Sequence, residues 1–429
     1  MAGSIWLPAL LHGLGLATGG LVLWWAGGAR RNLPLLLVLG LYAVLTWYTP
    51  VVNYLTGNTT LYGTDFTDRV GETLMIYALA VNALLLGYLA RPTPSRRLTR
   101  VLERWEVPED FVRRKLPLLW LVVGGIVALN LALFAVLHWP VSLHGVLYSV
   151  GVSPYLEGFT DSLLTVFILS WLTRRTGWKS LVGWSICLLL LLGFFFLINW
   201  RYRIIMTMIM LLGDYLLRRG VTWRLLASAG AAALTVILIT VNRGVLFYGR
   251  YHELTLDITQ FNERTVRDQT NNSQMFGVLL GYLDRPDVHH DWGYSTFGFI
   301  PLRAVPGQLF PGGKKPLPPL MEAIQRAFPP TGKAIPSAVT NVGEAYFAFG
   351  LPGVLGVMFL FGYLLRAAPP PHDGPGGGVL HRALYLLFTA WLFQYVTRGY
   401  LPQHVELAAY LLLPPAALHW WHRARRATS

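Results

Sequence analysis

Apolar stretches of about 20 residues recur along the chain, and they restrict its fold more than any other feature of the sequence. A helix needs about 20 mostly apolar residues to cross the ~30 Å hydrocarbon core of a bilayer. We mark eleven such stretches, at roughly 4–27, 33–54, 72–90, 116–138, 156–173, 180–200, 202–217, 225–242, 341–365, 379–397 and 405–421. The sequence therefore predicts an all-α polytopic membrane protein with about 11 transmembrane helices.

The composition agrees with this class. Of the 429 residues, 54% are hydrophobic and only 13% are charged, which does not fit a soluble enzyme with a polar shell. The single cysteine, Cys187, lies in an apolar stretch, so neither a disulfide framework nor a cysteine-bound metal cluster is expected. The first apolar stretch has no basic leader and no clear cleavage site, and we interpret it as a retained helix rather than a signal peptide.

The basic residues indicate an orientation in the membrane. Loops rich in Lys and Arg stay on the cytoplasmic side. With eleven spans, the most basic connections share one side; they lie around Arg30, at 91–115, 174–179, 218–224 and 366–382, and at 423–426. This pattern predicts an external N-terminus and a cytoplasmic C-terminus, and it accounts for the formal charge of +14 without a nucleic-acid partner.

The predicted topology divides the chain into three segments. Residues 1–242 hold spans one to eight, 243–340 form one long external loop, and 341–429 hold the last three spans. A loop of this length is usually functional. Within it we expect short helices in 258–283, and an extended or re-entrant path through the Gly- and Pro-rich residues 292–319.

One cytoplasmic loop contains a further helical pattern. In the sequence RRLTRVLERW, near 96–106, Leu98, Val101 and Trp105 recur at helical spacing with arginines between them. This pattern is typical of an amphipathic helix that lies on a surface of anionic lipid. A helix that binds a partner protein is the alternative.

Several cations lie on the external side, where the positive-inside rule expects few. A group of them implies an anionic ligand, and planar guanidinium groups suit a phosphate or diphosphate. The candidates are Arg201, Arg203, Arg243, Arg303, Lys315 and Arg398. Each could instead pair with a nearby acid or reach lipid headgroups. Near the cytoplasmic side, Asp214 and Arg218 have the spacing of an ion pair within one helix.

Histidines offer two further candidates. His289, His290 and Asp291 are consecutive, which is a poor spacing for metal ligands, so we expect a solvated loop there. His404 follows Arg398 in a short external turn and could be a general base or a plain polar turn residue.

The ninth span begins with a carboxylate, Glu344. Asn341 and Glu344 have the spacing of a capping box, in which each side chain bonds the backbone amide of the other. The same carboxylate would lie at the external, positive end of its helix, where an anionic ligand would arrive. We also expect a proline kink in this span and a flat glycine face for packing, made by Gly350, Gly353 and Gly356.

Three motifs follow one another in the last third of the chain. GYSTFGFIPLRAVPGQLFPGGKKP lies in the external loop, NVGEAYFAFGLPG starts the ninth span, and TRGYLP ends the tenth. Their order resembles that of the oligosaccharide repeat unit polymerases, the Wzy-type O-antigen polymerases of bacteria. The match includes Pro301 and Arg303, with Leu302 inserted between them, the Lys315–Pro316 pair, and Gly343, Glu344 and Tyr346.

The resemblance implies a GT-C-like membrane glycosyltransferase in the bacterial inner membrane. Such an enzyme transfers a growing glycan from undecaprenyl diphosphate to a sugar hydroxyl of the next lipid-linked repeat unit. It implies Glu344 as general base, with His404 as second candidate, the external cations as diphosphate or glycan contacts, and Tyr346 and Trp292 as stacking partners for sugars. The sequence has no DxD motif, so the implied reaction uses neither a metal nor another cofactor. Membrane lipid and a chain-length regulator are the other implied partners.

Three other functions remain open at this point. An O-antigen ligase would use the same donor with another acceptor. A flippase or transporter of lipid-linked glycans would carry two similar halves and charges near the middle of the membrane, which we do not find in the sequence. A non-catalytic partner in polysaccharide export would not need its arginines for bond formation.

Overall fold

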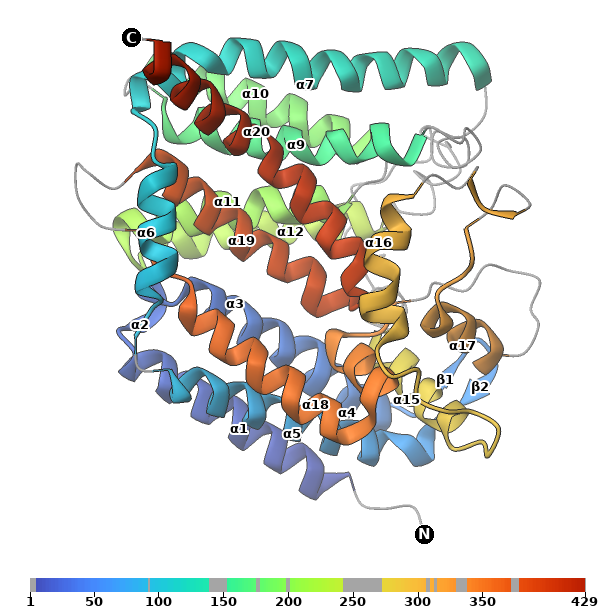
Figure 1. Ribbon diagram of the computed structural model, residues 1–429. Helices are drawn as coiled ribbons and strands as arrows, with labels where there is room; N and C mark the ends of the chain where they lie inside the picture. Colours follow the sequence, from blue (N-terminus) through green and yellow to red (C-terminus); the bar gives the residue numbers. More distant parts are fainter. Residues whose placement is uncertain are drawn as a thin grey trace. The chain divides into compact units, whose positions relative to one another are not determined.

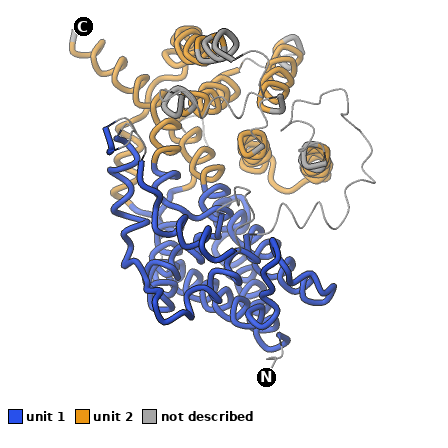
Figure 2. Tube along the Cα trace, turned by 90° about the vertical axis from the view of Figure 1, so that its right-hand side faces the viewer, with its two compact units in different colours: residues 1–95, 266–369, 392–405 blue, residues 96–265, 370–391, 406–429 orange. Residues whose placement is uncertain are grey.

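In the residues that it describes, the computed structural model is all-α apart from one short β-ribbon (Figure 1). It describes residues 5–428 except 92, 139–152, 175–177, 198–200, 242–271, 306–308, 312–314, 329–337 and 372–377. The chain forms two compact units, coloured separately in Figure 2. Unit 1 comprises Met1–Ser95, Val266–Pro369 and Leu392–Val405, and unit 2 comprises Arg96–Thr265, Pro370–Trp391 and Glu406–Ser429. Each unit contains residues from all three predicted segments, because those segments were defined by the predicted topology and not by packing.

Unit 1 contains the first helices of the chain and the helices between residues 266 and 369. Its elements are α1 (Trp6–Trp25), α2 (Gly28–Arg31), α3 (Leu33–Tyr42), the π-helical η1 (Ala43–Tyr48), α4 (Thr49–Leu55), β1 (Thr60–Leu61), β2 (Thr64–Asp65), the 3₁₀ turn η2 (Thr67–Arg69), α5 (Val70–Ala90), α15 (Asn272–Leu283), the π-helical η5 (Tyr294–Gly298), α16 (Phe299–Ala304), α17 (Pro319–Ala327) and α18 (Asn341–Ala367). The antiparallel β-ribbon pairs Thr60 with Asp65 and Leu61 with Thr64.

Unit 2 contains most of the middle of the chain. Its helices are α6 (Arg96–Trp105), α7 (Glu109–His138), α9 (Ser153–Leu172), α10 (Trp178–Leu197), α11 (Arg201–Arg219) and α12 (Trp223–Val241). The last two helices, α19 (Val379–Arg398) and α20 (Leu401–Thr428), each contribute residues to both units.

The predicted apolar stretches are helical in the structure. Each of the eleven coincides with a described helix or, for 33–54, with the consecutive pieces α3, η1 and α4. By length and composition, four helical segments in the described part of the chain could cross a membrane: Trp6–Trp25, Leu33–Leu55, Thr67–Ala90 and Asn341–Ala367. The all-α class is confirmed, and these four helices support a membrane-embedded protein. The number of eleven spans stays a prediction.

Helices α5 and α18 pack closely within unit 1, and two glycines permit this. A Cβ atom on Gly87 would overlap the backbone of Phe359, and one on Gly362 would overlap the backbone of Leu84. Small residues let helix backbones approach each other in this way. The predicted glycine face is therefore wrong, because the close approach uses Gly362, whereas a Cβ on Gly356 would meet open space.

The predicted kink in α18 is present. Gly350 has φ 65° and ψ −158°, outside the helical region, two residues before Pro352. The left-handed φ suits glycine, which has no Cβ to clash with the backbone. The bend interrupts the helical hydrogen-bond ladder. Nδ1 of His290 lies 3.1 Å from the carbonyl oxygen of Phe347, just before the bend, and thus supplies a donor for that carbonyl.

The Gly- and Pro-rich segment 292–319 differs from the prediction. We expected an extended or re-entrant path after Trp292, but η5 and α16 make residues 294–304 helical. The side chain of Asp291 explains the difference, since it accepts hydrogen bonds from the amides of Gly293 and Ser295 at 3.0 and 2.7 Å. A carboxylate that satisfies the first amides of a helix stabilises its start. The run from His289 to Asp291 is thus at least partly structural.

The amphipathic segment near 96–106 forms helix α6, as predicted. Leu98 and Val101 are exposed on it. At its end, the ring of Trp105 stacks on His419 with the centroids 5.1 Å apart. The contact of α6 with lipid stays a prediction.

Candidate functional site

Helix α18 begins differently from the predicted capping box. The N-cap is Thr340, whose hydroxyl accepts a hydrogen bond from the amide of Gly343 at 3.3 Å. The side chain of Asn341 instead accepts a hydrogen bond from the hydroxyl of Tyr42 at 3.0 Å. The capping box is therefore wrong, because Asn341 lies one residue inside the helix and its side chain is bound by another helix.

Glu344 caps a different helix from its own. Its Oε1 accepts a hydrogen bond of 2.9 Å from the amide of Leu401, the first residue of α20. The amide of Tyr400 and the hydroxyl of Thr296 also face the carboxylate. Glu344 is only 3% exposed. A carboxylate at the N-terminus of a helix is stabilised by the amides and the dipole there, so this contact fixes the carboxylate in one position.

A sharp turn at residues 398–400 brings the amide of Leu401 to Glu344. Gly399 and Tyr400 both have left-handed backbones, with φ of 58° and 56°. A Cβ on Gly399 would lie 2.8 Å from the carbonyl oxygens of Val339 and Thr340. The turn thus packs directly on the residues that precede α18. This close approach explains the glycine of the Arg-Gly motif, because a residue with a Cβ would clash there.

Three of the predicted cations lie in the same unit as Glu344. The guanidinium group of Arg303 lies over the ring of Tyr400, 5.9 Å from its centroid. Nζ of Lys315 donates a hydrogen bond of 2.6 Å to the carbonyl oxygen of Arg303. Arg398 is exposed at the end of α19, and it and Arg303 both influence His404 electrostatically. The structure therefore brings two separate motifs to the turn beside Glu344.

His404 is buried in this group, one residue before the predicted last span. Burial lowers the pKa of His404 to about 3, and the positive charges of Arg398 and Arg303 act in the same direction. Its ring packs edge-on against Tyr395, with the centroids 6.0 Å apart. A group with so low a pKa takes up a proton poorly at neutral pH, so the burial of His404 is unfavourable for its predicted role as a general base.

Three buried tyrosines near the start of α18 do not stand out in the sequence. The hydroxyl of Tyr77 in α5 lies 3.2 Å from that of Thr340, and Tyr42 in α3 binds Asn341. Tyr395 of α19 lies close enough to Glu344 for an electrostatic effect. Hydroxyl groups inside apolar helices need a partner when they are buried. That rule could have singled out these tyrosines, although it does not identify the partners.

Tyr346 and Trp292 have different surroundings. Tyr346 is half-buried, with edge-on contacts to the rings of Phe276 and His290 at centroid distances of 5.6 and 5.8 Å. Arg69, which pairs with Glu72 and Asp284, lies near it. Trp292 is 77% exposed and has a left-handed backbone. An exposed aromatic ring is available for stacking, whereas Tyr346 already packs on two rings.

Two of the remaining predicted cations, Arg201 and Arg203, belong to unit 2. Arg203 lies in unit 2, only 1% exposed, and its Nε pairs with Asp161 at 2.7 Å. Its guanidinium group also lies 4.6 Å from the ring centroid of Tyr202. Arg201 is the first residue of α11 in the same unit. Arg243 lies outside the described residues. Arg203 is therefore paired with a nearby acid, which is the alternative to ligand binding that the sequence left open.

The described residues contain no group of three or more His, Cys, Asp or Glu side chains that could hold a metal ion. Comparison with protein families, with curated proteins and with solved structures finds no match to this chain.

Proposed function

We propose that this chain is a membrane glycosyltransferase that polymerises undecaprenyl-diphosphate-linked oligosaccharide repeat units into a surface polysaccharide. The bond from Leu401 to Glu344 carries the proposal. It joins the Gly-Glu motif of α18 to the Arg-Gly turn, and Arg303 of the first motif, GYSTFGFIPLRAVPGQLFPGGKKP, lies over Tyr400 in that turn. Three motifs that resemble one family thus meet at one buried carboxylate.

The residues of this site suit the parts of a glycosyl transfer. The acceptor hydroxyl gives its proton to Glu344 while its oxygen attacks the anomeric carbon of the donor glycan. The bond from that carbon to the diphosphate breaks, and the diphosphate leaves with the electron pair. Arg303 and Arg398, with Lys315, stabilise the leaving charge in place of a metal. Because Glu344 is buried, the turn at 398–400 has to open before the hydroxyl can reach it.

The chain would cross the bacterial inner membrane eleven times in a GT-C-like arrangement, with its N-terminus outside and its C-terminus in the cytoplasm. The four apolar helices and the basic connections support this. Glu344 would then face the outer surface, where lipid-linked repeat units are joined. A chain-length regulator would be a further partner.

Substitution of Glu344 tests the chemical role. Glu344→Gln keeps an oxygen that accepts from the amide of Leu401 but cannot take up a proton. We expect polymer formation to fall by about 100- to 10,000-fold with unchanged thermal unfolding, as for loss of a general base. The assay uses purified protein in vesicles with lipid-linked repeat units. The matched control is Glu322→Gln, an exposed glutamate paired with Arg326. Full activity of Glu344→Gln would leave Glu344 as a structural cap of α20.

Gene deletion separates the proposed polymerase from the ligase. The surface glycans of the deletion strain are compared with the parent on a gel. A single repeat unit on the acceptor supports the polymerase. Full-length polymer that stays on its lipid carrier supports the ligase instead.

A further inference from the structure

Unit 2 contains a second buried carboxylate, Asp214, near the end of α11. It is 2% exposed, and it pairs with Nε of Arg218 at 3.0 Å and with Nε of Arg382 at 2.8 Å. Nε1 of Trp171 donates a third bond, also of 3.0 Å. The predicted pair of Asp214 and Arg218 is confirmed. Arg382 and Trp171 join it from α19 and α9.

A third arginine, Arg174, lies next to this group. Its Cζ lies 3.4 Å from the ring centroid of Trp171, and its Nη1 donates to the carbonyl oxygen of Trp171 at 2.6 Å. Burial, and then the charge of Arg218, lower the pKa of Arg174, although Asp214 acts in the opposite direction. Positive charge thus outweighs negative charge around Arg174.

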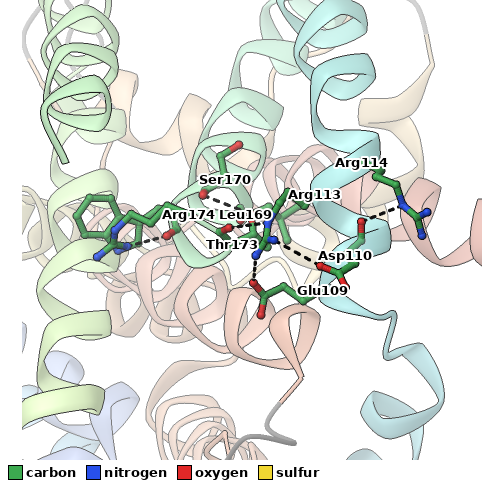
Figure 3. A network of polar contacts seen from close by, with 9 residues as sticks. Glu109, Asp110, Arg113, Arg114, Leu169, Ser170, Thr173 and Arg174 are labelled. Atoms are coloured by element: carbon green, nitrogen blue, oxygen red, sulfur yellow. Dashed lines mark hydrogen bonds and ion pairs between the residues drawn. The ribbon is translucent and has the colours of Figure 1, made fainter. Parts of the chain in front are cut away.

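The end of α9 that carries Arg174 is fixed by α7 (Figure 3). Arg113 donates from Nε to the carbonyl oxygen of Thr173 at 3.2 Å and pairs with Glu109 at 2.5 Å and with Asp110 at 3.4 Å. Two carboxylates therefore accompany Arg113 in the same region. By contrast, Arg174, Arg218 and Arg382 gather at one carboxylate, Asp214.

We propose that Arg174, Arg218 and Arg382 bind a phosphate group, presented by the headgroup of an anionic phospholipid. All three lie near helix ends at the edges of predicted spans: Arg174 follows α9, which ends at Leu172, Arg218 is next to the end of α11 at Arg219, and Arg382 is in the first turn of α19, which begins at Val379. Headgroups lie at this depth, and basic pockets between helix ends bind them. Asp214 pairs with Nε of Arg218 and with Nε of Arg382, and the guanidinium group of Arg174 lies against the ring of Trp171. Guanidinium groups recognise phosphate through paired hydrogen bonds. This site does not depend on the proposed reaction.

Lipid titration of the purified full-length protein tests the proposal. The probes are short-chain phosphatidylglycerol, phosphatidylcholine and inorganic phosphate, and binding is followed by native mass spectrometry in detergent. We expect phosphatidylglycerol to bind at least about tenfold more tightly than phosphatidylcholine. Equal binding of the two lipids would overturn the proposal. If inorganic phosphate bound as tightly as phosphatidylglycerol, the assignment to a lipid would be wrong.

Arg174→Gln is the decisive variant, because Arg174 has no ion pair with Asp214 among the contacts described above and its loss leaves that pair intact. It should lose most of the preference for phosphatidylglycerol, and Arg174→Gln combined with Arg382→Gln should lose all of it. Arg114→Gln is the matched control, since Arg114 is an exposed arginine on α7 near Arg113 (Figure 3). Retained preference in Arg174→Gln, or equal loss in Arg114→Gln, would show that the cluster is not the binding site.

Discussion

Glu344 in unit 1 and Asp214 in unit 2 are both buried carboxylates on helices, yet the protein stabilises them differently. Asp214 is paired with two arginine side chains, and Asp161 is paired with Arg203 in the same way. Glu344 is held by the amide of Leu401 at the start of another helix. A carboxylate that is paired with guanidinium groups is neutralised in place, and its removal leaves buried positive charge. A carboxylate held by a neutral amide has no opposite charge in that contact, which suits the proposed role of Glu344 as a proton acceptor.

The largest effect is expected where an arginine and a carboxylate are both buried. Arg203→Ala should lower the free energy of unfolding by about 3 to 5 kcal/mol, because it leaves Asp161 buried without its partner. The measurement is unfolding of the purified protein in mixed micelles with increasing SDS. Arg326→Ala, at an exposed ion pair, is the control and should change stability by less than about 1 kcal/mol. A stable but inactive Arg203→Ala protein would instead make Arg203 a substrate contact and break the comparison.

Removal of the Glu344 side chain should have the next largest effect on stability. Glu344→Ala leaves the buried amide of Leu401 without its acceptor and opens a cavity, at a cost of about 2 to 3 kcal/mol. Glu344→Gln retains the acceptor and should unfold like the parent. The same unfolding assay compares the two variants. Equal destabilisation by both would mean that the negative charge itself holds the two helices together, as at Asp214.

Acid should destabilise unit 1 through His404. Its pKa is lowered to about 3 in the folded protein, below the ordinary value of 6.5, so the unfolded chain binds more protons between these pH values. The stability is fully present above pH 6.5 and is lost as the pH falls toward 3, by about 2 kcal/mol at pH 5. Unfolding at pH 7 and pH 5 measures this loss. His404→Gln, which cannot be protonated, should show a smaller loss; an unchanged difference would assign the acid sensitivity to other groups.

The smallest expected effect concerns the turn that presents Leu401 to Glu344. Gly399→Ala introduces a Cβ at φ 58°, against the carbonyl oxygens of Val339 and Thr340, and should cost about 1 to 2 kcal/mol. Gly356→Ala, inside α18 where a Cβ meets open space, is the control and should be neutral or stabilising. If the turn positions Glu344, Gly399→Ala should also slow polymer formation. Unchanged activity at normal stability would separate the turn from the function.

Several features of the site could be recognised in the sequence because they depend on local spacing. The motifs that contain Glu344, Arg303 and Arg398 stand out by their order. The amphipathic pattern of α6 and the pair of Asp214 and Arg218 follow from residues within one or two turns of a helix. Local spacing does not fix the start of α18, because Thr340 and Asn341 are both suitable caps. The structure has Thr340 as the N-cap, while the side chain of Asn341 is bound by Tyr42.

The sequence by itself determined the helical class, the positions of the long apolar helices and the residues with chemical potential, since hydrophobicity and periodicity are properties of adjacent residues. Only the tertiary structure decided which of those residues meet. Glu344 and Leu401 are 57 positions apart, and Arg203 and Asp161 are 42 apart. Such contacts depend on how the helices pack and on backbone turns such as that at Gly399, and no local pattern contains that information. The fold thus places Arg203 in a buried ion pair and Glu344 at the start of another helix, although the sequence presented both as candidates of the same site.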